Sequence, residues 1–103
     1  APDQFTILPI SEKYVDYAKK VSQLLENHDI SGLIDDRNEK TGKKIRDAEL
    51  KKIPFMIVVG ENEEKDGTIS VRRRGEGDLG AMKLEDFVSY FKKASETGFE
   101  FKA

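Results

Sequence analysis

Apolar positions along the chain follow two patterns that take turns. Residues 4–10 and 31–35 are short apolar runs of the kind that forms strands, and 55–59 is a continuous apolar run typical of a strand covered on both faces. In three other stretches apolar residues recur every three or four positions, which predicts helices at 11–28, 41–53 and 84–94. This alternation predicts an α/β domain built on a mixed sheet.

The second half of the chain predicts a hairpin. Residues 61–67 are polar and turn-like, and they end in Asp66-Gly67, a favourable turn pair. A strand is expected at 68–74, and a shorter one at 79–82.

Alternation along the first hairpin strand predicts which side chains it exposes. Ile69 and Val71 share one face, whereas Ser70 and Arg72 share the other. Because successive strand residues point to opposite faces, we expect Arg72 to be free for a ligand. Glu63 is expected to lie near enough across the turn to orient the Arg72 guanidinium by a charge-assisted hydrogen bond.

Composition limits the chemistry that the chain can perform. It has 103 residues, the size of one domain, and 18 Lys and Arg against 20 Asp and Glu give a net charge of −2. Cysteine is absent and histidine occurs once, which excludes a Cys/His zinc site, a disulfide framework and a thiol nucleophile. Neither a membrane helix nor a secretion signal is expected. We therefore expect a cytoplasmic protein without a membrane partner.

Three features resemble parts of enzyme sites, and each has a simpler structural explanation. His28 lies near the end of the first predicted helix, where it can meet the last carbonyls. Asp35 and Asp36 follow a strand, but without a third acidic ligand nearby we favour a turn over a metal site. The glycines of residues 75–80 spell G-x-G-x-x-G, but they follow arginines and precede an apolar stretch, which argues against dinucleotide binding.

Positive charge is concentrated in two places within this nearly neutral chain. Between residues 37 and 52 seven basic residues stand against three acidic ones, and residues 72–74 are consecutive arginines. Such clusters are typical of surfaces that bind a phosphate backbone, and an arginine beside them can read guanine. A charged helix face with internal ion pairs, such as Lys43 with Asp47, explains the first cluster equally well. Charge alone leaves both interpretations open.

Two stretches of the chain carry a dense series of motifs. They are DDRNEKTGKKIRDAELKKIPFMIVVG at residues 35–60 and GTISVRRRGEGDLGAM at 67–82. In this order the motifs resemble the carboxy-terminal anticodon-binding domain of threonyl-tRNA synthetases, which are class II aminoacyl-tRNA synthetases. The resemblance covers about residues 1–94 and leaves 95–103 as a tail. The synthetases for proline, histidine and glycine share the fold and match these motifs less well.

The resemblance implies both a fold and a function. The fold is a five-stranded mixed sheet flanked by three helices, in agreement with the hydrophobic pattern. The function is recognition of the threonine tRNA anticodon, whose second and third bases are G and U. The chain would be an excised, non-catalytic domain that needs no cofactor and binds no DNA. The parent enzyme, a homodimer, would attach threonine to its tRNA and hold ATP, Mg and Zn in a catalytic core that lies elsewhere.

The resemblance also implies which residues read the anticodon. By motif position they are Asn38 in RNEK, Glu63 in the loop after VVG and Arg72 in VRRRG. Ile10, after the first strand, would offer an apolar contact to a base. Arg72 and Glu63 suit guanine, because a guanidinium complements its acceptor edge and a carboxylate complements its donor edge.

The basic helix supplies the remaining expected contacts. By motif position the resemblance implies that Arg46, in KIR, also contacts RNA. Lys43 and Lys44 are expected to contact phosphate without reading a base.

Two other classes of function compete with this one. A synthetase-like accessory subunit would use the same fold to bind protein, and it would be expected to lose the residues that read bases. A small flavodoxin-like enzyme would need a phosphate loop and a nucleophile pair, and the sequence has neither.

Overall fold

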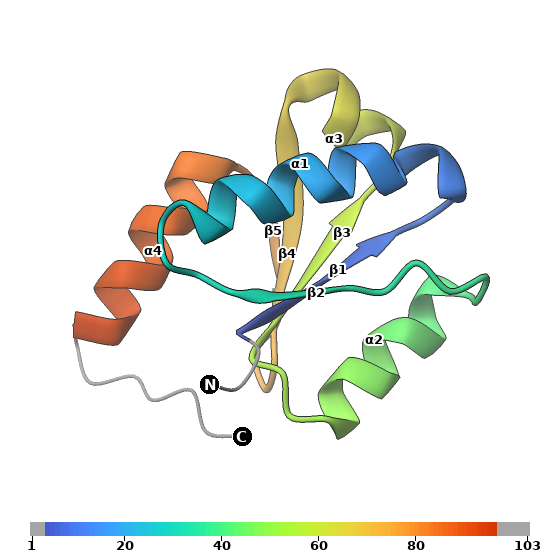
Figure 1. Ribbon diagram of the computed structural model, residues 1–103. Helices are drawn as coiled ribbons and strands as arrows, with labels where there is room; N and C mark the ends of the chain where they lie inside the picture. Colours follow the sequence, from blue (N-terminus) through green and yellow to red (C-terminus); the bar gives the residue numbers. More distant parts are fainter. Residues whose placement is uncertain (1–3, 97–103) are drawn as a thin grey trace.

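The computed structural model describes residues 4–96, and Figure 1 shows them as one sheet with helices on both faces. The five strands lie in the order β2-β1-β3-β4-β5. They are β1 (Phe5–Pro9), β2 (Gly32–Ile34), β3 (Phe55–Val59), β4 (Thr68–Arg73) and β5 (Gly77–Lys83). β1 runs parallel to β2 and β3, whereas β3, β4 and β5 are antiparallel neighbours. The predicted mixed sheet is confirmed.

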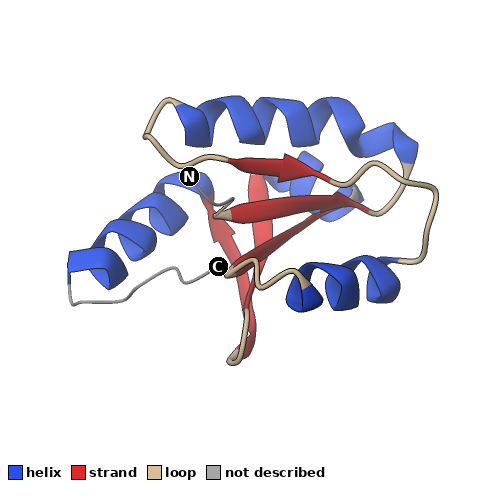
Figure 2. Ribbon diagram, turned by 60° about the horizontal axis from the view of Figure 1, so that its bottom comes forward, coloured by secondary structure: helices blue, strands red, loops and turns tan. Residues whose placement is uncertain are grey.

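Three longer helices cover the sheet, as predicted. They are α1 (Val15–Glu26), which follows the short 3-10 helix η1 (Glu12–Tyr14), α2 (Thr41–Leu50) and α4 (Leu84–Glu96). Figures 1 and 2 show α1 and α2 on opposite sides of the sheet. The larger core lies under α1 and α4, and the smaller one joins Leu8 and Met56 to Ala48 of α2. Of the three longer helices, α2 is therefore the one on the face that carries the even-numbered residues of β4.

One predicted turn is a helix. Residues 61–67 were expected to be turn-like, but α3 occupies Glu61–Asp66. Its first turn contains Glu61, Glu63 and Glu64, whose carboxylates are stabilised by the free N–H groups of a helix N-terminus. The segment has none of the apolar periodicity by which a helix is recognised, because its side chains stay exposed or half-buried.

Two helices end earlier than the hydrophobic pattern predicts. α1 ends at Glu26 and not near His28, which is exposed in the following turn, and α2 ends at Leu50. In each case the amide of a buried isoleucine just beyond the helix bonds back five residues, from Ile30 to Leu25 and from Ile53 to Ala48. This Schellman motif ends each helix, and the isoleucine beyond the helix still packs in the core.

The glycines of the G-x-G-x-x-G series shape the β4–β5 hairpin. Gly75, Gly77 and Gly80 have φ of 87°, 85° and 89°, in the left-handed region. The pairing of β4 with β5 shifts between Val71 and Arg72, which marks a bulge. β5 follows the series where a dinucleotide fingerprint needs a helix, so the structure agrees with its rejection.

Candidate nucleic-acid interface

A groove of about 370 Å³ lies at the carboxyl edge of the parallel strands. Its walls come from the residues just after β1 and from the loop after β2, and they include Ile10 and Asn38. In open α/β sheets ligands bind at this edge, beyond the ends of parallel strands. Two of the residues that the sequence singles out therefore meet in one cavity.

Glu63 belongs to the same edge, because it follows β3, the third parallel strand. Ile10 and Glu63 approach each other across Gly60. A Cβ atom added to Gly60 would stand 2.6 Å from Ile10 Cδ1 and 3.3 Å from Glu63 Oε1. Ile10 is 53% exposed, an unusual position for so large an apolar side chain. The edge thus presents an apolar surface beside a carboxylate.

The carboxylate of Glu63 is held by a serine, and this corrects one prediction. Ser70 Oγ donates a hydrogen bond to Glu63 Oε2 at 3.2 Å. Within residues 4–96 Glu63 makes no hydrogen bond or ion pair with Arg72. The two lie apart because Arg72 is two residues beyond Ser70 on β4, roughly 7 Å along the strand.

Arg72 lies on the same face of the sheet as Ser70, as strand alternation predicts. It stands opposite Met56 on β3 and Asp78 on β5. Its side chain is half-buried, and within the described part of the chain its Nε atom is buried without a hydrogen-bond partner. An unsatisfied buried N–H costs on the order of 1–3 kcal/mol.

Tyr17 of α1 anchors the turn beside α3. Its hydroxyl donates a hydrogen bond to the Thr68 carbonyl at 2.7 Å. Burial raises the pKa of this hydroxyl, and the carboxylates of Glu63 and Glu64 raise it further. The acidic side chains of α3 therefore act on this end of the sheet as negative charge.

The three cations expected on α2 occupy different environments. Arg46 is exposed, and it lies two residues from Lys44, on the other side of the helix. Lys43 is also exposed and pairs with Glu39 at 3.4 Å, so the internal ion pair exists with a different partner from the expected Asp47. Neither Lys43 nor Arg46 lines the groove.

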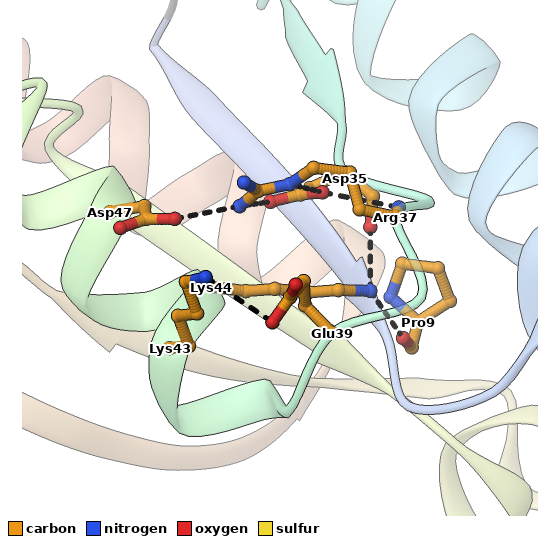
Figure 3. Close-up of polar contacts among 7 residues, drawn as sticks. All are labelled: Pro9, Asp35, Arg37, Glu39, Lys43, Lys44 and Asp47. Carbon is orange, nitrogen blue, oxygen red and sulfur yellow. Dashed lines mark hydrogen bonds and ion pairs between the residues drawn. The ribbon is translucent and has the colours of Figure 1, made fainter.

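Lys44, which was expected to contact phosphate, has a buried side chain. It is 3% exposed, and Figure 3 shows its ammonium between two strand ends. Nζ donates to the carbonyls of Asp35 at 3.0 Å and Pro9 at 3.3 Å. A lysine can be buried in this way because its stem packs with apolar groups while its ammonium finds oxygen partners.

The loop after β2 is fastened by an ion-pair network that the sequence did not reveal. Arg37 forms a two-pronged contact with Asp35, through Nε and Nη2 at 2.8 Å each, and also contacts Asp47 of α2 at 2.9 Å (Figure 3). The hydrogen bonds from Arg37 hold the pKa of Asp35 below its usual value, although partial burial opposes them. Asp35 and, after it, Asp47 raise the pKa of Arg37.

Other site types find no support in the described residues. Among residues 4–96 no three His, Asp or Glu side chains gather closely enough to hold a metal ion, and Asp35 serves the turn as expected. No helix within that range is long and apolar enough to cross a membrane.

Comparison with known proteins shows the family to which the chain belongs. Residues 4–94 match the family model described as "Anticodon binding domain". The chain belongs to this family.

Two proteins with similar sequences are both threonine–tRNA ligases. The chain is 58% identical over 86 residues to a threonine–tRNA ligase of Bacteroides thetaiotaomicron, and 61% identical over 90 residues to one of Flavobacterium johnsoniae. These alignments cover 84% and 85% of this chain. The chain spans only 13% and 14% of the length of the two ligases.

A solved structure has the same fold. It is the crystal structure of the RNA binding domain of threonyl-tRNA synthetase from Cryptosporidium parvum, which superposes with a TM-score of 0.84 at 32% sequence identity. The match covers 97% of this chain and 24% of that chain. The mixed α/β architecture is therefore that of a known RNA binding domain of a threonyl-tRNA synthetase.

Proposed function

We propose that this anticodon-binding domain reads the anticodon of threonine tRNA, with G and U as its second and third bases. The observation that carries the proposal is the convergence of three candidate residues on one edge of the sheet. Ile10, Asn38 and Glu63 each follow a different parallel strand and meet around the groove and Gly60. The similarity to threonine–tRNA ligases supports threonine as the amino acid.

The chemistry of these side chains suits unstacked RNA bases. RNA is read chiefly at loops whose bases are splayed out, stacked and hydrogen-bonded at their polar edges. We assign the exposed Ile10 to an apolar base contact, and Asn38 and Glu63 to polar edges. Arg72 reads guanine, since its guanidinium suits the O6 and N7 acceptors.

The exposed cations of α2 provide contacts without base information. Lys43 and Arg46 lie on the solvent side of the helix, where phosphates of the stem-loop can approach them. Contacts of this kind position the RNA and make its affinity depend on salt. Lys44 is omitted from this set because its ammonium is buried.

For the whole protein we propose the activity of its relatives, attachment of threonine to tRNA at the cost of ATP. In that protein the described residues would supply RNA binding, while ATP, Mg and Zn would be held by other parts. Homodimerisation and a cytoplasmic location belong to the same proposal.

Titration with RNA stem-loops tests the function. A loop that carries the threonine anticodon is compared with loops in which the second or third base is replaced. We expect the cognate loop to bind more tightly by about 5- to 150-fold for each replaced base, the effect of one base contact of about 1–3 kcal/mol. Equal affinity for all loops would leave only non-specific RNA binding. Binding to no loop would favour a protein-interaction module.

A further inference from the structure

The strands β1 and β2 separate at the groove, and Lys44 lies where they separate. Their pairing covers Phe5 to Ile7 against Gly32 to Ile34, and the Asp35 amide adds a bond to the Ile7 carbonyl. Beyond that bond one carbonyl from each side, those of Pro9 and Asp35, accepts a hydrogen bond from the Lys44 ammonium. The lysine thus joins the two walls of the groove where direct pairing between the strands has ended.

A second link joins the same loop to α2. Arg37 grips Asp35 with two nitrogen atoms and reaches Asp47, one turn along α2 from Lys44. The Glu39 amide bonds to the Arg37 carbonyl at 2.9 Å. The loop at residues 35–39 is therefore held through its backbone by Lys44 and through the Arg37 side chain by Asp47. The ion pair of Glu39 with Lys43 is solvent-exposed and contributes little.

The side chain of Asn38 has no such fastening. It lines the groove, and within residues 4–96 it makes no hydrogen bond. Its position therefore depends on the backbone of the loop that carries it. A loop held within a fraction of an ångström is what recognition of a base edge requires, because hydrogen bonds weaken steeply with poor alignment.

We propose that Lys44 and Asp47 are positioning residues, through which α2 sets the loop at residues 35–39 in the geometry that reads the anticodon. The inference rests on the proposed function, and it gives Lys44 a different role from a phosphate contact. A positioning residue changes discrimination between bases, whereas a phosphate contact changes affinity for all RNAs and the dependence of affinity on salt.

The first experiment compares Lys44→Met with Lys43→Met, which removes the same charge from the neighbouring exposed position. Stem-loop affinity is measured over about 50 to 200 mM salt. For Lys43→Met we expect the slope of log K against log salt to become shallower by about 0.7, the value for one single-strand phosphate, with discrimination unchanged. For Lys44→Met we expect an unchanged slope and about a tenfold loss of discrimination at the second or third base. A shallower slope for Lys44→Met, or unchanged discrimination in the folded variant, overturns the proposal.

The second experiment uses Asp47→Ala, which leaves the buried lysine in place and decides the matter by itself if Lys44→Met does not fold. Its matched control is Glu49→Ala, which removes the same charge from the same helix without loosening the loop. We expect Asp47→Ala to lower discrimination by several-fold, and Glu49→Ala to leave it unchanged. Equal discrimination in the two variants overturns the proposal.

Amide hydrogen exchange on the free protein separates this inference from the proposed function. We expect exchange at residues 35–40 to become faster in Lys44→Met and Asp47→Ala, and to be unchanged in Glu49→Ala. Unchanged exchange in the first pair overturns the inference. Failure of the wild-type chain to distinguish anticodons would overturn the proposed function, whatever the exchange shows.

Discussion

Ser70 donates a hydrogen bond to Glu63, and this bond connects α3 to the face of β4 that also carries Arg72. Both partners are half-buried, so the bond fixes one carboxylate oxygen in a setting where water competes less well for it. The other oxygen, Oε1, faces the Cα of Gly60 and the neighbouring Ile10. The serine therefore determines which oxygen of the carboxylate stays free of this hydrogen bond.

The first prediction concerns this serine. Ser70→Ala removes the donor, and we expect the free energy of unfolding to fall by about 0.5–1.5 kcal/mol, the usual net value of one hydrogen bond. Discrimination for guanine should fall as well, because Glu63 loses its fixed orientation. Thermal unfolding and stem-loop titration measure the two effects. The control is Ser89→Ala, an exposed change on α4 that should alter neither. Wild-type discrimination in Ser70→Ala would show that Glu63 needs no such orientation.

The second prediction uses the contact across Gly60. In Gly60→Ala the new Cβ would stand 2.6 Å from Ile10 Cδ1 and 3.3 Å from Glu63 Oε1, so we expect these side chains to shift while the backbone stays in place. We expect little loss of stability but weaker binding of the cognate stem-loop. Gly42→Ala is the matched control, because nothing lies within 4 Å of a Cβ there. It should raise stability by about 0.5–1 kcal/mol, as alanine suits a helix better, and leave binding unchanged. Equal RNA binding by both variants would remove Ile10 from the site.

The third prediction concerns acid. The pKa of Asp35 is lowered in the folded chain, chiefly by hydrogen bonds from Arg37. A lowered folded pKa adds stability above the unfolded pKa of about 3.9, and this contribution is lost as the pH falls through the folded value. We expect Asp35→Asn to lose stability at pH 6 and to converge on the wild type once the pH falls below the lowered pKa of Asp35. Denaturant unfolding across this range is the measurement. A constant difference between the two proteins would contradict the pKa assignment.

The fourth prediction concerns salt. Arg46→Ala should weaken binding to cognate and altered loops equally, and should make the slope of log K against log salt shallower by about 0.7–0.9. The control is Lys19→Ala, an exposed cation on α1, which covers the other face of the sheet. Its slope should match that of the wild type. If Arg46→Ala selectively weakens binding to the cognate loop, Arg46 reads a base.

Strand alternation and helical periodicity were enough to predict the sheet, the three main helices and the orientation of Arg72. These patterns are local, so a short window of sequence contains them. The burial of Lys44 is not local. Its charge and the sparse apolar positions of α2 both favour a lysine on the surface. The carbonyls that accept its hydrogen bonds become available only where β1 and β2 separate.

The partner of Glu63 was missed for a similar reason. Alternation had already placed Ser70 on the same face as Arg72, and that was a usable signal. The choice of Arg72 as the partner relied on charge, whereas the spacing along β4 decides it. The helical form of α3, which sets where Glu63 points, has no apolar period to reveal it.

The last prediction follows from the proposal that Arg72 reads guanine at the second anticodon position. Its guanidinium carries a buried Nε without a partner among residues 4–96, so removal of the side chain takes away an unsatisfied donor. Arg72→Ala should therefore change stability by less than about 1 kcal/mol, because lost packing and relieved desolvation oppose each other. Lysine keeps the charge but lacks the planar guanidinium and its paired N–H donors, so Arg72→Lys should not restore guanine recognition.

The most direct measurement is the ratio of affinities for stem-loops with guanine or adenine at that position, in the wild type, Arg72→Ala and Arg72→Lys. We predict that both variants lose about 1–3 kcal/mol of discrimination while they remain folded. Unchanged discrimination in both folded variants would contradict the assignment of Arg72 as a reader, and with it the account of how this domain recognises its anticodon.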